Sequence, residues 1–250
     1  MDSSSLCRDL DLVAGNGCIL TVEQRAALQV SLVSLKKNHK FTRVLFWGKI
    51  LGLERDYFIA QGRGEHEMRD RKNLYSLNCM DWVLLPTVTD SMIKEVSGAA
   101  NRRFKGDPSY VDHTKVTEEK RLAVTVHCID EDVSVVPRGA FIRRPNGLVQ
   151  INRSFGGLSD SEAHRLENFV HFSKPKGFKK SIPAADFLDT IDDDIPKGSW
   201  SLQFEGVGKV CVLRSLLWLG LTFYHVPMTP QHGYIYMGDG IKNVDLPFML

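Results

Sequence analysis

Residues 43–60 read RVLFWGKILGLERDYFIA and mark the point at which the sequence pattern turns from helical to extended. Aromatic and β-branched residues, which favour strands, fill residues 44–51 and again residues 56–60. Gly52 begins a short turn between the two runs. This segment therefore predicts an antiparallel hairpin and a β-rich core built around it.

The residues before this hairpin carry a helical period instead. A short helix is predicted over residues 6–13, ending at the breaker sequence Gly-Asn-Gly of residues 15–17. Thr21 and Gln24 have the spacing of a capping box, in which each residue satisfies a backbone N–H of the other. A second helix is therefore predicted from this point. Its apolar face carries Leu28, Leu32 and Leu35.

The middle of the chain yields mixed patterns. Residues 61–72 are predicted to form a charged connector, and residues 112–120 a polar segment. Residues 122–129 alternate between two sets of side chains, which predicts a strand with one buried face. Asn146-Gly147 between two apolar runs predicts a hairpin. Ser159 is predicted to begin a helix that buries Ala163, Leu166, Phe169 and Val170.

The last fifty residues predict a meander of strands. Four runs carry the strand pattern, at residues 200–204, 210–218, 221–226 and 234–237. The fold class predicted is α+β: an antiparallel β-sheet core of hairpins and a C-terminal meander, with N-terminal helices and short inserted helices. A single domain is expected over residues 1–250, with a helical segment at 1–40 and the β-rich core at 41–250.

Composition narrows the function classes. The 250 residues include 32 Lys and Arg and 30 Asp and Glu, a net charge of +2, which argues against nucleic-acid binding. The N-terminus lacks the basic and apolar regions of a secretory signal, and no membrane insertion is expected. The five cysteines are scattered without a C-x-x-C pair, so neither a disulfide framework nor a zinc site is expected.

Catalytic motifs are incomplete. His66-Glu67 begins a sequence that has Asp70 where the H-E-x-x-H metal motif needs its second histidine. Gly206-Val207-Gly208-Lys209 lacks the flanking residues of a phosphate loop, so a hairpin turn is predicted there. The acidic runs at residues 130–132 and 192–194 lack calcium-loop spacing and are interpreted as solvated turns. We therefore predict no catalytic, cofactor or metal residue.

The chain is rich in aromatic residues, which serve both cores and protein interfaces. Trp and Tyr are enriched at interfaces, and open sheets offer edges for pairing. The residues predicted to contact partners are Trp47, Tyr57, Trp82, Trp218 and Tyr224. The sequence alone leaves open which aromatic side chains are core and which are interface. A basic stretch with Lys174, Lys176, Lys179 and Lys180 is an alternative docking site.

Blocks along nearly the whole chain resemble radial spoke head proteins of motile cilia, most closely the radial spoke head protein 9 family. The blocks include residues 43–53, 56–62, 74–79, 106–110, 195–201, 213–218, 222–225 and 245–250. Two of them, around Trp47-Gly48-Lys49-Ile50 and Leu213-Arg214-Ser215, are also similar to radial spoke head proteins 4 and 6, which suggests a shared core. The chain departs from the family in having only residues 111–121 where a longer charged insert is usual. It also has Leu219 where a proline is expected.

The resemblance implies a non-catalytic structural subunit of the axonemal radial spoke head. The spoke transmits signals between the central pair apparatus and the dynein arms, and so supports ciliary and flagellar motility. Radial spoke head proteins 4 and 6 are the implied partners, with 1 and 3 beside them, and the central pair is contacted indirectly. The implied location is the cytoplasm and cytoskeleton, at the axoneme of the cilium or flagellum. Two alternatives stay open: a metal-dependent hydrolase using the His66-Glu67 segment, and a cytosolic protein-interaction adaptor.

Overall fold

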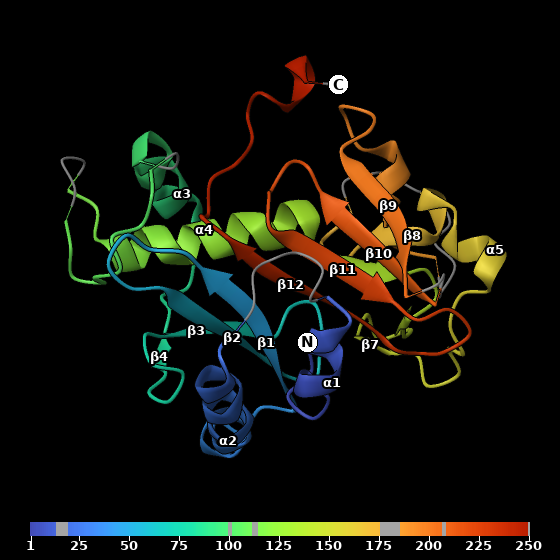
Figure 1. Ribbon diagram of the computed structural model, residues 1–250, viewed down its shortest axis with the longest axis horizontal. Coiled ribbons are helices and arrows are strands. Elements are labelled where there is room, and N and C mark those ends of the chain that lie inside the picture. The colour runs from blue at the N-terminus through green and yellow to red at the C-terminus, as the bar shows by residue number, and fades with distance from the viewer. Residues whose placement is uncertain (14–19, 100–101, 112–114, 176–185, 207–208, 250) are drawn as a thin grey trace.

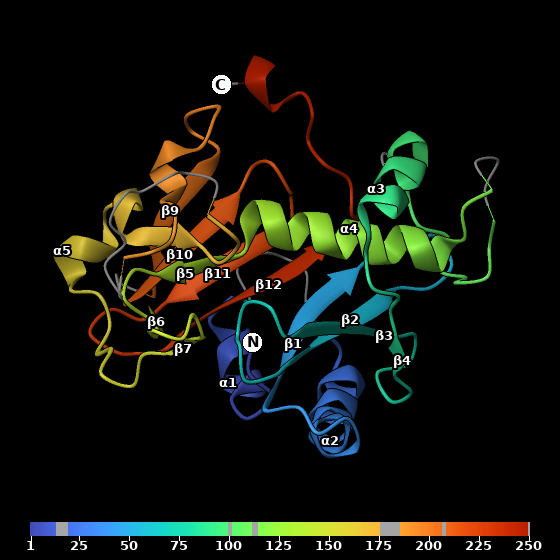
Figure 2. The ribbon, with the colours of Figure 1, turned by 180° about the vertical axis from the view of Figure 1, so that it is seen from behind.

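An eight-stranded sheet runs through the middle of the protein, with helices on both of its faces (Figures 1 and 2). The computed structural model describes residues 1–13, 20–99, 102–111, 115–175, 186–206 and 209–249. The strand order is β4-β3-β2-β1-β12-β11-β10-β9, so the first and last parts of the chain form the two halves of one sheet. Two small two-stranded sheets, β5-β8 and β6-β7, lie beside it. The prediction of an α+β fold is confirmed.

The N-terminal helices form as predicted. Helix α1 spans Leu6–Asp11, while the Gly-Asn-Gly breaker expected after it lies outside the described residues. Helix α2 spans Val22–Asn38, and the capping box at its start is present in both directions, with Gln24 N donating to Thr21 Oγ1 and Thr21 N to Gln24 Oε1. The three predicted leucines of its apolar face are buried against the sheet.

The first half of the sheet grows from the predicted hairpin. Strands β1 (Arg43–Ile50) and β2 (Tyr57–Arg63) pair antiparallel, as expected. β3 (Arg71–Ser76) and the short β4 (Val83–Leu84) follow. The charged connector is shorter than predicted, because β2 runs on to Arg63 and β3 already begins at Arg71. Residues at both ends of the predicted connector instead continue the pairing of β2 with β3: Gln61 pairs with Asn73 and Gly62 with Lys72.

The second half is the predicted meander. It consists of β9 (Trp200–Glu205), β10 (Val210–Ser215), β11 (Leu221–His225) and β12 (His232–Gly238), each antiparallel to the next. Residues 207–208 of the predicted turn between β9 and β10 lie outside the described part of the chain. Each strand lies within about three residues of the predicted range.

A parallel pairing of β1 with β12 joins the two halves, a feature that the sequence did not predict. Gly48 lies opposite Tyr236 in this pairing, next to a β-bulge in β1. A Cβ at Gly48 would lie 2.0 Å from the Tyr236 carbonyl oxygen, and the backbone there has φ of +148°. Only glycine permits this close approach of two strands.

The strand predicted at residues 122–129 is wrong: these residues lie in helix α4, Glu118–Val133. Leu122, Val126 and Ile129 face the main core at helical spacing. Val124, on another side of the helix, packs with Val96 in a separate small cluster. Because α4 is buried on two sides, its apolar residues imitate the alternation of a strand. Thr117, whose hydroxyl accepts from Lys120 N, caps the helix.

The remaining short elements surround this frame. Helix α3 (Asp90–Val96) has Thr89 as its cap and leads into the 3-10 turn η2 (Ser97–Ala99). The helix predicted from Ser159 ends early: α5 spans Asp160–Ala163 and is followed by η3 (Leu166–Asn168). Phe169 and Val170 lie instead in strand β8, Phe169–His171, which pairs with β5, Val135–Pro137. The Asn-Gly hairpin is confirmed as β6 (Phe141–Arg143) and β7 (Val149–Ile151). The remaining 3-10 turns are η4 (Ile191–Asp193) and η5 (Leu246–Phe248).

Two apolar cores lie on opposite faces of the sheet. Along β2 the side chains alternate between them, with Tyr57 and Ile59 in the core under α4 and Phe58 and Ala60 in the core under α1 and α2. Figure 2 shows α4 crossing the face of the sheet that is turned toward the viewer. Burial of strand β2 on both faces explains why its first four residues, 57–60, are continuously apolar. No helix in the described ranges has the length and apolar character that a bilayer span requires.

Candidate functional site

The aromatic residues predicted to contact partners lie mostly inside the protein. Trp47, Tyr57, Trp218 and Tyr224 are buried, the first three in the core under α4 and Tyr224 in the core under α1 and α2. Trp82 is half-buried at the rim of the second core. The structure thus places four of the five in the folded interior, and a role of any of them in partner contacts stays a prediction.

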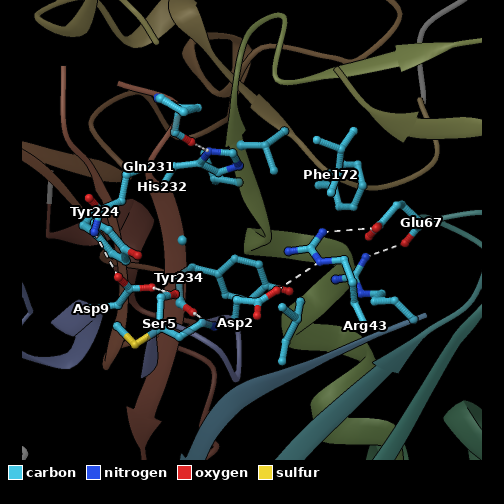
Figure 3. A pocket seen from close by; sticks show the side chains of 18 of the residues that line it. Asp2, Ser5, Asp9, Arg43, Glu67, Phe172, Tyr224, Gln231, His232 and Tyr234 are labelled. Carbon is cyan, nitrogen blue, oxygen red and sulfur yellow. Dashed lines mark hydrogen bonds and ion pairs between the residues drawn. The ribbon is translucent and has the colours of Figure 1, made fainter. Parts of the chain in front are cut away.

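The candidate site is a pocket of about 370 Å³ into which several polar side chains converge (Figure 3). It lies where the N-terminal segment, β1, β12 and the β6–β7 hairpin meet. Its walls are mainly apolar. They include Leu45, Val136, Phe141, Ile151 and Phe172.

Arg43 links two acidic side chains at the rim of this pocket. Its Nε lies 3.1 Å from Asp2 Oδ2, and its Nη1 lies 3.1 Å from Glu67 Oε1 (Figure 3). Burial alone would raise the pKa of Asp2, but hydrogen bonds from Ser4 and the charge of Arg43 hold that pKa below its usual value. The rim is therefore closed by a charge network that ties the N-terminus to the loop after β2.

A second polar contact closes the opposite side. Gln231 Nε2 donates to Asp9 Oδ1 at 2.9 Å, and Ser5 Oγ donates to the other carboxylate oxygen of Asp9. The Met1 amine donates to the Phe46 carbonyl at 2.8 Å, and burial lowers its pKa to about 5. The first nine residues are thus held in place by contacts with strands from both halves of the sheet.

Arg63 is a buried cation beside the pocket. Its guanidinium donates to the Glu67 carbonyl and lies 5.4 Å from the centre of the Phe172 ring. Burial lowers its pKa to about 10, so it stays charged at neutral pH. Its Nε has no hydrogen-bond partner among the residues that the structure describes.

Tyr234, which lines the pocket, is one of several strand residues whose side chains donate to Asp130 of α4. This carboxylate accepts from Trp47 Nε1 at 2.7 Å, Gln61 Nε2 at 2.6 Å and Tyr234 Oη at 3.1 Å. Arg71 lies 3.9 Å from its second oxygen. This arrangement corrects the interpretation of residues 130–132 as a solvated turn, since Asp130 is 4% exposed. The last turn of α4 turns this side chain toward the sheet.

His232 is the imidazole that lines the pocket. Its Nδ1 donates to the Pro230 carbonyl at 2.9 Å, and its ring stands edge-on to Phe141. Burial lowers its pKa to about 4, so the ring is neutral at neutral pH. A neutral imidazole against apolar walls suits the binding of an apolar or aromatic group better than proton transfer near pH 7.

The His66-Glu67 segment does not assemble a metal site in the described structure. His66 Nδ1 accepts from the backbone N–H of Met68 and Arg69, while Glu67 pairs with Arg43. Across the described ranges, no group of three or more His, Cys, Asp or Glu side chains is placed to hold a metal ion. Of the basic stretch, Lys174 is exposed, and Lys176, Lys179 and Lys180 lie outside the described residues.

The buried polar residues are the ones that sequence reasoning missed. Besides Asp130 and Arg63, Glu118 is 3% exposed and accepts from Tyr57 Oη and from the backbone N–H groups of residues 105–107. Glu118 follows Thr117, which caps α4. Recognising α4 as a helix would have found this residue, because acidic side chains favour a first turn.

The family profile and the individual relatives that match this chain all point to the same protein family. The profile of radial spokehead-like proteins matches residues 2–78. The chain is 59% identical to the radial spoke head protein 9 homolog of Danio rerio, and 45% and 46% identical to those of Homo sapiens and Bos taurus. Each alignment covers the full length of both chains. The alignments span 277 positions against 250 residues here, so the relatives carry residues that this chain lacks. The sequence analysis places this difference in length at residues 111–121, and that placement stays a prediction.

Proposed function

The chain belongs to the radial spoke head protein 9 family, and on this premise we propose that it works in the spoke head as a non-catalytic structural subunit. The observation that carries the proposal is the 59% identity over the full length of a radial spoke head protein 9 homolog. The candidate pocket agrees with it, because Asp2, Asp9 and Glu67 already accept hydrogen bonds or ion pairs from within the chain. Carboxylates engaged in this way hold the fold together.

Within the head, the subunit supports the passage of signals between the central pair apparatus and the dynein arms, and hence ciliary and flagellar motility. Such a role needs a body that keeps its shape under load. A sheet whose two halves share cores on both faces provides this rigidity. Radial spoke head proteins 4 and 6 are the neighbours that we propose, with 1 and 3 next to them. The family membership supports a location at the axoneme.

Cross-linking mass spectrometry on isolated axonemes tests this proposal. We expect cross-links from surface lysines of this chain, such as Lys36 and Lys174, to other spoke-head subunits. Axonemes that lack the chain should lose ordered spoke heads and beat abnormally, and re-expression should restore both. Cross-links only to proteins outside the spoke, or normal beating without the chain, would contradict the proposal.

A further inference from the structure

Helix α2 is apolar on two opposite faces, and the fold uses only one of them. Leu28, Leu32 and Leu35 pack on the sheet. On the outer face Val22 is 79%, Val30 63% and Val33 47% exposed.

The outer valines form a continuous stripe because of their spacing. Val22, Ala26, Val30 and Val33 follow one another at intervals of four, four and three residues, which places them on one side of a helix. Figures 1 and 2 show α2 at the rim of the protein, with its outer side directed away from the sheet. A stripe of this kind, exposed along a helix of 17 residues, is typical of a surface that packs against another helix.

The charges at the two ends of α2 indicate which helix would pack against this stripe. Glu23 lies in the first turn, and Lys36 and Lys37 lie in the last turn. A second α2 that runs antiparallel would bring Glu23 of each copy close to the lysines of the other. A parallel arrangement would place like charges together. The stripe and its flanking charges are therefore complementary to themselves in the antiparallel direction.

We propose that α2 pairs antiparallel with α2 of a second copy of this chain across a two-fold axis. An arrangement centred between Gln29 and Val30 sets Ala26 of each copy level with Val33 of the other, a small side chain against a larger one. The same surface of both copies then meets itself, as in an isologous dimer. This inference goes beyond the proposed function, since a spoke-head subunit need not pair with itself.

Sedimentation equilibrium of the purified full-length chain, over a range of concentrations, tests the pairing. The wild-type chain should show a monomer–dimer equilibrium. Val30→Glu should weaken dimerisation at least tenfold, because it places like charges in the centre of the seam. Leu53→Glu is the matched control, since Leu53 is also exposed, at 67%, but lies in the turn between β1 and β2. Equal melting temperatures of the variants would show that both are folded.

A charge exchange tests the direction of the pairing. Glu23→Lys alone and the double variant Lys36→Glu/Lys37→Glu alone should each dimerise more weakly than the wild type. An equimolar mixture of the two should recover association as a mixed dimer. A wild-type chain that stays monomeric at every concentration would overturn the inference, as would a mixture no stronger than its components. If such a monomer still cross-links to spoke-head subunits in axonemes, the proposed function stands and another protein covers α2.

Discussion

Asp130 shows how one side chain connects separate parts of the fold. It is buried on α4, and its donors come from strands β1, β2 and β12. A buried carboxylate is tolerated only where hydrogen bonds and a nearby cation compensate for the loss of water. Removing it leaves several donors unsatisfied at once, which costs more than the loss of any single contact.

Replacement of Asp130 is therefore expected to be severe. Asp130→Ala should lower the free energy of unfolding by about 3–5 kcal/mol, the range for breaking a buried charge network. Urea denaturation followed by circular dichroism measures the change. Glu131→Ala, at the half-buried neighbouring position, should change it by about 0.5 kcal/mol or less. Similar losses in the two variants would show that Asp130 has no special role.

His225 predicts a pH dependence of stability. Its Nδ1 donates to the Gln231 carbonyl and its Nε2 accepts from Leu158 N, so the fold holds a neutral ring, and burial lowers its pKa below the ordinary value of 6.5. Below pH 6.5 the unfolded chain binds a proton that the folded chain does not. The free energy of unfolding should then fall, by up to about 1.4 kcal/mol per pH unit for this one group.

The check is a series of urea titrations between pH 7.5 and 5. His225→Gln should flatten the dependence between pH 6.5 and 5. Because the folded-state pKa is lowered, the slope from His225 fades above about pH 7.5, where the ring is neutral in the unfolded chain as well as in the folded one. An unchanged slope in His225→Gln would contradict the assignment.

The sequence could not reveal the role of Asp130 because its neighbours resemble a solvated run. Asp130, Glu131 and Asp132 are chemically alike, and only the rotation of α4 turns the first toward the sheet. The aromatic residues pose the same problem. Trp47 and Trp82 look equally suited to a core or an interface, but only the first is fully buried. Burial at a single position depends on tertiary contacts that one sequence does not specify.

At the scale of elements, segments with a strong local sequence signal were predicted correctly. The capping box predicted helix α2, and the aromatic and β-branched runs predicted the β1–β2 hairpin. Helix α4 was missed because apolar residues occupy two of its sides, which hides the helical period. The parallel pairing of β1 with β12 could not be predicted from local sequence patterns either, because it joins residues nearly 190 positions apart.

That pairing makes a sharp prediction at Gly48. Gly48→Ala would place a Cβ against the backbone of Tyr236, where no side-chain rearrangement can relieve the contact. We expect a loss of more than about 2 kcal/mol in the free energy of unfolding, from the mechanism of backbone strain. Hydrogen exchange should show faster exchange of the amides of β12. Gly98→Ala is the control, because no atom lies within 4 Å of its added Cβ. Normal protection of β12 in Gly48→Ala would contradict the close approach.

At the scale of the whole molecule, the two cores share the strands that separate them. The Leu32 side chain lies in the core under α2, and the Val126 side chain lies in the core under α4. Strand β2 sends alternate side chains into both. Loss of either core should therefore expose the strands of the other, which predicts that residues 1–250 unfold as one domain.

Leu32→Ala tests this coupling. Leu32 is fully buried, so its truncation should lower the free energy of unfolding by about 2–5 kcal/mol. If the sheet couples the faces, the most protected amides of α4, on the far side, should lose the same free energy in native-state hydrogen exchange. Ser34→Ala, on the exposed side of the same helix, should leave α4 protection within about 0.5 kcal/mol of wild type. Unchanged protection of α4 in Leu32→Ala would instead mean that the two faces unfold as separate units, because the α2 core would then be lost while the α4 core stayed intact.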